Sequence, residues 1–482
     1  MTDHPRRAGR RRSGAGRDCS GPGRATAAAL PRHPRHDARA TLHRAATAAL
    51  LLLLALAAGG CINTDELLEV DIPGRVSEDA LDDPRLAQTL VNSVIADVEC
   101  SWDNYVAAAA HHSDEWIASS GNSTMARWGL RDIPPAFEAM ATGGCATSYG
   151  LFTPLHGARF QAESNYDRIA GFPDADVPNK TALLATIRAY GAFPLIAFSE
   201  GFCGTPLDGG DAVLGSRELA ALAETKLTEA IDLATQAGLD DIRNLALVGR
   251  ARARLTQEDY EGVLDDASEI PEGFRFVATR DNQPGDRQNA HYEAVNGVAS
   301  DAAGQKHATV APNFRDLQWK EVDDPRVNVE WDGTLGFDFF TKHYRHDKVN
   351  SFDAPTTMAS WEEAQLFMAE AYALTDRLDE ARAIFQMLHE RAGIPEVTAE
   401  DIPTREDVVR HLIEERLRQF FSEGGHRLRD HLRWRGTGFE VPFLGEPGSI
   451  HPDGQLLDAE TGEALRVYEN ATCFPVPLVE QR

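Results

Sequence analysis

The chain has 482 residues, of which 26% are charged, and a formal net charge of −27 at pH 7. Residues 1–60 carry 11 Lys and Arg against 3 Asp and Glu, whereas residues 61–482 carry 37 against 72, a net charge of −35. Such an acidic surface repels phosphate backbones and anionic lipid headgroups. The composition therefore excludes nucleic acid as a partner and leaves any attachment to a membrane to a covalent lipid.

An apolar run, Ala45–Ala58, follows a His-Arg pair and precedes Gly59-Gly60-Cys61. The run is shorter than the roughly 20 apolar residues that a bilayer-spanning helix needs, so it predicts a cleaved signal peptide. Small residues directly before a cysteine are typical of lipoprotein signals, which makes Cys61 the predicted lipid-attachment residue. The alternative is an ordinary signal peptide cleaved near Gly60, with Cys61 left as a free thiol.

Residues 1–40 are rich in Arg, Gly, Pro and Ala and contain almost no large apolar side chains. A segment of this composition cannot form a core, so we exclude it from the fold. It is either a basic tail or a stretch upstream of the true start of the signal peptide. Residues 1–60 are thus predicted to be a basic N-terminal extension and a cleaved signal, and residues 61–482 the mature domain.

Four cysteines remain in the mature chain besides the predicted lipid-attachment residue. They are Cys100, Cys145, Cys203 and Cys473. An even number of cysteines in an exported protein predicts two disulfides, with three possible connectivities that the sequence does not separate. The alternative is four buried free thiols, because unpaired cysteine is itself commonly buried.

Helical signals dominate the mature chain. Asp83-Pro84 reads as an N-cap followed by proline in the first turn, and apolar residues then recur on one helical face up to Val98. Residues 181–202 predict a second helical stretch interrupted at Pro194. A third begins at Ser216 and ends at Gly238.

Two later segments, 245–271 and 361–393, align with each other at offsets of 0, 9, 12 and 16. The matched residues are Ala251, Tyr260, Val263 and Ala267 in the first segment and Ala369, Leu378, Ala381 and Phe385 in the second. A small residue, a turn and a second amphipathic helix are typical of a tetratricopeptide-type hairpin. The predicted fold is therefore mainly α, with a tetratricopeptide-like helical-repeat core.

Two regions, about 100–160 and about 270–355, lack sustained periodicity and predict loops with some strand. Long irregular insertions in compact proteins are usually functional. Sugar binding uses flat apolar faces together with polar groups, so aromatic residues in these regions are the candidate ligand contacts. They are Trp102, Trp116, Trp128, Trp319, Trp331 and Tyr344, with Asp114, Glu115, Asn313, Asp332 and Asp338 as candidate polar contacts. Core packing is the alternative for each tryptophan, because tryptophan is usually largely buried.

The sequence gives no specific signal for catalysis, a cofactor or a metal. His111-His112 with Asp114, and His343 with His346, lack the spacing and third ligand of a zinc site. No nucleophile elbow, phosphate-binding loop or zinc-protease motif is present. Paired carboxylates are too frequent in so acidic a chain to indicate a glycosidase. We therefore expect a binding protein, with a surface glycoside hydrolase or a helical-repeat protein-binding adaptor as alternatives.

The last third of the chain contains a helix, a glycine break and a second helix, carried by Glu414-Glu415-Arg416, Phe420-Phe421, Glu423-Gly424, Arg427, Asp430 and Arg433-Trp434. This pattern resembles the C-terminal signature of the RagB/SusD family of nutrient-binding outer-membrane lipoproteins. Other segments agree in the same order: Leu67-Leu68-Glu69-Val70 with Pro73, Leu155, Ala158-Arg159-Phe160, Ala162-Glu163, Asp324-Pro325-Arg326-Val327, Ala369-Glu370-Ala371-Tyr372 and Phe474-Pro475-Val476-Pro477. The resemblance spans about 65 to 480, and an extra glycine, Gly425, is one departure from it.

The resemblance implies a lipid-anchored protein on the outer face of the outer membrane that works with a SusC-like, TonB-dependent transporter. It implies a helical core that packs against the transporter barrel, an irregular region that binds an oligosaccharide or a peptide, and no catalysis. We expect the signature residues themselves to be structural rather than to bind the ligand. We expect buried pairs such as Glu415 or Glu423 with Arg427 or Arg433 to fix the angle between two helices.

Overall fold

The computed structural model describes residues 78–481 except 146–148, 284–286, 297–305 and 459–460. The described residues belong to one structural unit, Ser77–Arg482. The predicted signal peptide and the predicted lipid-attachment residue, Cys61, lie outside the described residues.

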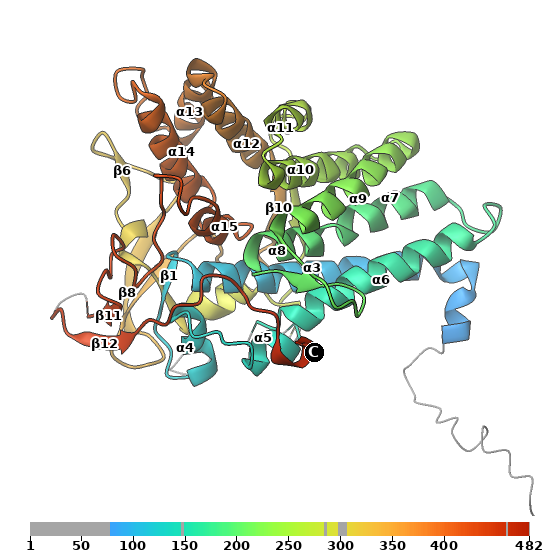
Figure 1. The fold of residues 1–482 in the computed structure, drawn as a ribbon, viewed down its shortest axis with the longest axis horizontal. Helices are drawn as coiled ribbons and strands as arrows, with labels where there is room; N and C mark the ends of the chain where they lie inside the picture. The colour runs from blue at the N-terminus through green and yellow to red at the C-terminus, as the bar shows by residue number, and fades with distance from the viewer. Residues whose placement is uncertain (1–77, 146–148, 284–286, 297–305, 459–460, 482) are drawn as a thin grey trace, which may run out of the picture. The chain divides into compact units, whose positions relative to one another are not determined.

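The unit is mainly helical, as predicted, with thirteen α-helices among the described residues (Figure 1). They are α3 (Ala87–His112), α4 (Ser123–Gly129), α5 (Glu138–Thr142), α6 (Phe152–Gly171), α7 (Lys180–Gly191), α8 (Phe193–Gly201), α9 (Ser216–Ala237), α10 (Asp240–Gln257), α11 (Tyr260–Ala267), α12 (Trp361–Leu374), α13 (Leu378–Ala392), α14 (Arg405–Gln419) and α15 (His426–Arg433). Short 3₁₀ turns flank them, including η2 (Pro84–Leu86), η4 (Pro312–Phe314) and η5 (Leu478–Glu480).

The strands among the described residues form six two-stranded antiparallel pairs. The pairs are β1 (Trp116–Ala118) with β5 (Ala308–Val310), β2 (Thr205–Pro206) with β3 (Val213–Leu214), β4 (Arg275–Ala278) with β10 (Thr356–Ser360), β6 (Gln318–Trp319) with β7 (Val322–Asp323), β8 (Val329–Leu335) with β9 (Lys342–His346), and β11 (Gln455–Leu457) with β12 (Ala464–Val467).

The predicted helix boundaries follow from local chemistry. The Asp83 carboxylate accepts a hydrogen bond from the Arg85 backbone N–H, which caps η2 and starts α3. The stretch from Lys180 is divided into α7 and α8 just before Pro194. It is also apolar and long enough to resemble a membrane span, but it lies mostly buried inside the unit. Gly238 ends α9 with a positive φ of 67°.

Hairpin-like helix pairs build the helical part of the unit. α10 packs against α9 and α11, and α12 packs against α11, α13 and α14, so these helices form a continuous series. Figure 1 shows the strand pairs β6, β8, β11 and β12 on one side of these helices. Small residues allow close approach: Ala251 in α10 and Ala369 in α12 are both fully buried.

The predicted loop-rich region 100–160 is more helical than expected, because α3 continues to His112. Polar residues in this segment suggested a loop, but they are buried with specific partners. The Asp103 carboxylate accepts hydrogen bonds from the Ala290 N–H and the Thr356 hydroxyl. Asn104 donates to the Gly150 carbonyl. The helix therefore continues through these polar residues, because other segments supply hydrogen-bond partners for their buried side chains.

The four cysteines among the described residues form two disulfides, Cys100–Cys145 and Cys203–Cys473. Their Cα–Cα distances, 5.6 and 5.2 Å, lie in the usual range for disulfides. The second links the loop after α8 to the C-terminal segment, next to the backbone hydrogen bond from Cys203 to Phe474. Of the three possible connectivities, the structure therefore selects this one.

The signature residues of the last third form a buried ionic network, but with partners that differ from those expected. Arg433 pairs with Glu370 and Asp430, and Arg416 also binds Asp430. Arg427 pairs with Asp114 rather than with a signature carboxylate. The expected pairs were therefore wrong, because each of these arginines has a nearer carboxylate on another segment.

The remaining two expected carboxylates also have other partners. Glu415 binds Arg326, and Glu423 lies near Arg275 and Lys348. The extra glycine, Gly425, has a positive φ of 71°, and a Cβ there would lie 2.7 Å from the Tyr105 ring. A glycine at this position therefore satisfies both the backbone conformation and the close packing.

Candidate ligand-binding site

The hairpin β8–β9 carries a group of aromatic side chains on the loop-rich side of the unit. Trp331 and Tyr344 are cross-strand partners, so they lie on the same face of the hairpin. Trp331 is 52% exposed, and the Lys342 ammonium lies 4.9 Å from its ring centroid. Tyr344 is half-buried beneath the Arg315 guanidinium, 3.6 Å from its ring centroid. Each of these two rings is thus in contact with one cation.

The turn between these strands holds two further aromatic rings in solvent. Asp338 accepts hydrogen bonds from the backbone N–H groups of Phe340 and Thr341 and from the Thr341 hydroxyl. Phe339 adopts a φ of +66° within this turn, which is uncommon for a bulky residue. As a result Phe339 is 68% and Phe340 43% exposed. Together with Trp331 they form what we call the aromatic hairpin: Trp331, Phe339 and Phe340.

A cavity of about 400 Å³ lies behind Phe340, between this hairpin and β11–β12. Its walls are apolar at Leu335, Phe340 and Ile450, and polar at Arg315 and Lys342. Residues Ile117, Pro312, Thr341, His451, Leu457, Asp458, Gly462 and Leu465 complete the lining. An apolar pocket with a few polar groups beside exposed aromatic rings is typical of a small-molecule binding site.

Electrostatic interactions fix the polar residues around this cavity. Burial lowers the pKa of the Arg315 guanidinium to about 10, so it remains protonated at neutral pH. Burial opposes ionisation of Asp332, but hydrogen bonds from Lys306, Thr334 and His343 outweigh it and hold the pKa of this carboxyl below its usual range. Asp332 thus stays charged and ties β8 to Lys306, which precedes β5. The hairpin is therefore held in place independently of a ligand.

Three of the six aromatic residues expected at the site are packing residues instead. Trp102, Trp116 and Trp128 have almost no exposed surface. Trp102 donates its indole N–H to the Thr357 carbonyl at 2.9 Å, and Trp116 donates to the Ser422 hydroxyl at 3.2 Å. Side chains buried in this way cannot stack on a ligand, so their assignment as ligand contacts is corrected.

Two of the expected polar contacts are also internal. Asp114 is buried, and its carboxylate accepts hydrogen bonds from Arg427 and Asn313. It also lies 3.0 Å from the His431 Nε2, which accepts from the Asp114 backbone N–H. Burial raises the pKa of the neighbouring Glu115 carboxyl to about 8, so this side chain is largely protonated at neutral pH. Neither carboxyl lines the cavity beside the aromatic hairpin, and both are buried in the core.

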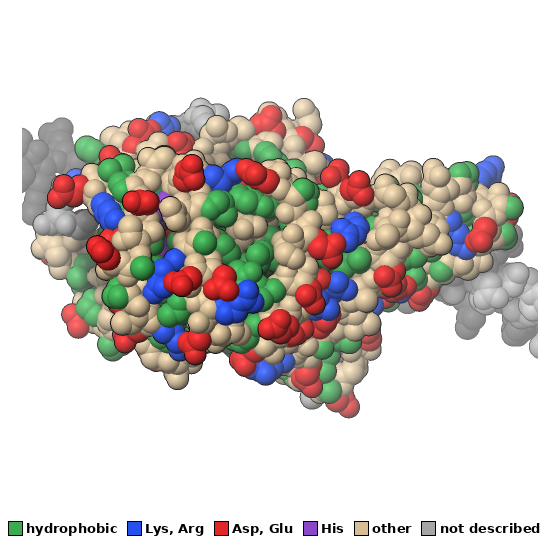
Figure 2. All heavy atoms as spheres, turned by 90° about the horizontal axis from the view of Figure 1, so that it is seen from above, with side chains coloured by type: hydrophobic (Ala, Val, Ile, Leu, Met, Phe, Trp, Pro, Cys, Tyr) green, Lys and Arg blue, Asp and Glu red, His purple; other side chains and the backbone are tan. Residues whose placement is uncertain are grey.

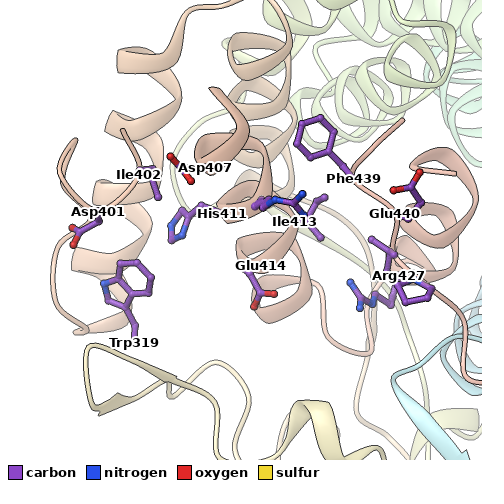
Figure 3. A pocket seen from close by; sticks show the side chains of 13 residues that line it. Trp319, Asp401, Ile402, Asp407, His411, Ile413, Glu414, Arg427, Phe439 and Glu440 are labelled. Carbon is purple, nitrogen blue, oxygen red and sulfur yellow. The ribbon is translucent and has the colours of Figure 1, made fainter. Parts of the chain in front are cut away.

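Trp319 lies in a different cavity, of about 450 Å³, between β6 and α14 (Figure 3). Its ring is 5.0 Å from that of His411 and 5.4 Å from that of His389. The structure therefore brings Trp331 and Tyr344 together and separates Trp319 from them. It adds Phe339 and Phe340, which lie within the irregular region 270–355 but were not among the predicted ligand contacts. The sequence signal for them is an aspartate before two phenylalanines in a turn.

The charged side chains do not segregate by sign on the face shown in Figure 2. Asp and Glu side chains lie interspersed with Lys and Arg there, and apolar side chains are exposed between them. On this face the surface is therefore mixed in character despite the acidic composition of the chain.

Comparisons with known proteins give a consistent result. Residues 363–471 match the SusD family. A SusD superfamily protein from Bacteroides vulgatus has a TM-score of 0.61 at 15% identity, covering 83% of this chain and 97% of that one. The comparison with curated protein sequences gives no match.

Two further similar structures carry descriptions of binding. A SusD-like carbohydrate binding protein from Bacteroides vulgatus has a TM-score of 0.55 at 15% identity, covering 73% of this chain and 83% of that one. Surface glycan-binding protein A from Bacteroides fluxus has a TM-score of 0.59 at 14% identity, covering 81% and 95%. At these identities the likeness establishes the fold. Residues 363–471 thus match the SusD family, and the chain shares the fold of these SusD-like structures.

Proposed function

We propose that this chain is a surface lipoprotein of the outer membrane that binds a nutrient glycan and delivers it to a TonB-dependent transporter. SusD family glycan-binding proteins are non-catalytic, which agrees with the expectation that the chain is not an enzyme. The descriptions of two similar structures, a carbohydrate binding protein and a glycan-binding protein, support a carbohydrate ligand.

The observation that carries this proposal is the aromatic hairpin. Three large apolar rings, those of Trp331, Phe339 and Phe340, are exposed on this hairpin, and the Phe340 ring also lines a cavity. Exposing them costs the free energy that burial would otherwise supply, about 1.5–3 kcal/mol for each large apolar side chain. Aromatic rings recover that free energy when the apolar face of a sugar ring covers them, while hydroxyl groups bond to polar neighbours.

The helical scaffold is proposed to be a tetratricopeptide-like repeat. The two aligned segments have the same burial at each of the four matched positions. Ala251 and Ala369 are buried, Tyr260 and Leu378 are half-buried, and the last two positions are buried in both. Equivalent burial at equivalent positions supports repetition of one supersecondary unit.

The domain organisation extends this proposal to the segments that the structure does not describe. Residues 1–60 are proposed to be removed with the signal peptide, and residues 61–482 to form the mature domain. A lipid on Cys61 would leave the folded unit, which begins near Ser77, tethered beside the membrane by a short segment. A tethered acidic domain of this kind suits a lid over a transporter.

Glycan binding by matched variants of the purified mature chain tests the proposal. A panel of oligosaccharides is screened first, and the affinity for any bound glycan is then measured by calorimetry. Trp331→Ala and Phe340→Ala should each weaken binding by about tenfold, because an aromatic contact contributes on the order of 1 kcal/mol. Phe160→Ala is the matched control, since Phe160 is 61% exposed but lies on α6, outside the site.

Two results would contradict the proposal. Equal affinities for all three variants would remove the aromatic hairpin from the binding site. Released sugars after incubation with the panel would favour a glycoside hydrolase instead. Delivery to a transporter is tested separately, by detergent extraction of native membranes: a barrel-sized partner should co-purify with the chain.

A further inference from the structure

A second group of chemically reactive side chains lies away from the aromatic hairpin. His389 of α13 and His411 and Glu415 of α14 meet beneath the ring of Trp319, and all three are buried. The His389 Nε2 lies 2.8 Å and the His411 Nε2 3.9 Å from the Glu415 Oε1. The ligand-type atoms of the three residues all lie within 4.8 Å of one another.

The contacts of His389 require a positive charge between its ring and the Glu415 carboxylate. Its Nδ1 lies 2.8 Å from the Pro395 carbonyl oxygen, which only accepts, so this nitrogen carries a proton. In the neutral ring the Nε2 then presents a lone pair to the Glu415 carboxylate, another acceptor. Such a contact requires a positive charge, which is either a second proton on His389 or a bound metal ion.

His411 favours the metal ion. Its Nε2 is buried and has no hydrogen-bond partner among the described residues, although it points toward the same carboxylate oxygen. A second proton on His389 would satisfy Glu415 and leave His411 unpaired, whereas one metal ion satisfies all three residues.

The geometry is close to that of a zinc site. Bonds of about 2.0–2.1 Å in a tetrahedron place neighbouring ligand atoms about 3.3 Å apart. The two observed distances to the Glu415 Oε1, 2.8 and 3.9 Å, lie on either side of this value. The outer contacts orient these groups: His389 donates to a backbone carbonyl, and Arg326 donates to both oxygens of Glu415, from Nη1 to Oε2 at 2.8 Å and from Nη2 to Oε1 at 3.2 Å.

An acidic cavity adjoins the cluster at His411, whereas the nearby Arg326 and Arg418 guanidinium groups are balanced by the Glu415 and Asp324 carboxylates. His411 also lines the cavity of about 450 Å³ described above, which gives a route of access from solvent (Figure 3). The carboxylates of this cavity outnumber its guanidinium groups and are Asp401, Asp407, Glu414 and Glu440. An acidic, partly enclosed cavity concentrates divalent cations.

We propose that His389, His411 and Glu415 form a binding site for a divalent transition-metal ion of the zinc class. Two imidazole nitrogens and one carboxylate oxygen supply three ligands, which leaves a fourth ligand to be supplied by water. The ion connects α13 to α14 beneath Trp319. This site is separate from the aromatic hairpin and does not depend on glycan binding.

Zinc binding to the purified mature chain, after removal of metals with a chelator, tests this proposal. Titration with Zn²⁺ alone by calorimetry should give one ion per chain, with a dissociation constant of about 1 µM or lower. His411→Gln should weaken binding by more than about 100-fold, because it removes a direct ligand. It should leave the fold intact, since the Nε2 of His411 has no hydrogen-bond partner to lose among the described residues.

A control variant and a second measurement make the test decisive. His156→Gln alters a histidine on α6 that contacts Thr205, far along the chain from the cluster, and should leave the Zn²⁺ affinity unchanged. Co²⁺ in place of Zn²⁺ should give the visible absorption of a tetrahedral site in wild type and not in His411→Gln. The absence of zinc binding, or equal affinities for both variants, would overturn the proposal and assign a second proton to His389.

Discussion

The buried pair of Asp114 and Arg427 gives the sharpest stability prediction. Arg427 of α15 donates two hydrogen bonds to the Asp114 carboxylate, at 2.5 and 2.6 Å. Asn313 donates to the same carboxylate at 2.9 Å, and the His431 Nε2 lies 3.0 Å from it. The segment after α3 is thus fastened to α15 by one charged group, and both partners are more than nine-tenths buried.

Asp114→Asn keeps the size of the side chain and removes its charge. The Arg427 guanidinium then remains buried without a counter-ion, which costs about 3–5 kcal/mol of unfolding free energy. For a folded unit of about 400 residues, an unfolding entropy of about 2.1 cal/mol/K per residue converts this loss into a fall in Tm of about 4–6 °C. Scanning calorimetry and urea titration measure the two quantities.

Glu406→Gln is the matched control, because Glu406 pairs with Arg410 at 2.9 Å on the exposed surface of α14. Such a pair contributes less than about 1 kcal/mol. Equal stabilities of Asp114→Asn and Glu406→Gln would refute the reasoning.

Burial opposes ionisation of Asp114, but Arg427 outweighs it and holds the pKa of this carboxyl well below its usual range. The wild-type advantage is therefore present above about pH 4 and lost as the pH falls below it.

Three further predictions concern other parts of the chain. Burial raises the pKa of Glu115 to about 8, so the folded chain retains a proton that the unfolded chain releases, and this residue lowers stability as the pH rises from about 4.5 to 8. Glu115→Gln should reduce that loss in urea titrations at pH 5 and 8; an unchanged difference between the two pH values would contradict this. Replacing both Cys203 and Cys473 with alanine removes a disulfide that links positions 270 residues apart. The free energy of unfolding, measured by urea titration, should fall by about 4–5 kcal/mol. An unchanged unfolding midpoint would show that this disulfide does not stabilise the fold. Cys61→Ala should move the protein from the membrane fraction to the soluble fraction, and retention in the membrane fraction would exclude the proposed lipid anchor.

The helices could be predicted because their signals are local. Asp83 caps the first long helix, the break before Pro194 divides α7 from α8, and Gly238 ends α9. Each of these effects acts within a few residues of the chain. The two repeat-like segments were likewise visible from the spacing of small and apolar residues.

The exposure of individual aromatic residues could not be predicted in the same way. Trp102 and Trp331 both lie among polar residues in the sequence, but Trp102 donates to Thr357, 255 residues away. Whether a tryptophan is buried depends on such distant partners. The exposure of the aromatic hairpin could not be predicted either, because it depends on the absence of such partners. The turn around Asp338 holds Phe339 outward, and no element among the described residues covers it.

The ionic partners of the signature residues could not be predicted from the sequence, for a related reason. The spacing of Glu415 and Arg427 is compatible with a contact, but Arg326 reaches Glu415 from a segment 89 residues away. The zinc-type cluster has the same origin. His389 and His411 are 22 positions apart on successive helices, and only the packing of α13 against α14 brings them together.

A crystal structure of the mature chain with a bound glycan tests the central claim most directly. We expect sugar rings to lie on Trp331 and Phe340, with hydroxyl groups directed toward the cavity that Arg315 and Lys342 line. The hairpin should keep its conformation, because Asp332 and Asp338 already fix it. A glycan bound elsewhere, such as in the cavity beside Trp319, with the aromatic hairpin uncovered, would contradict the account.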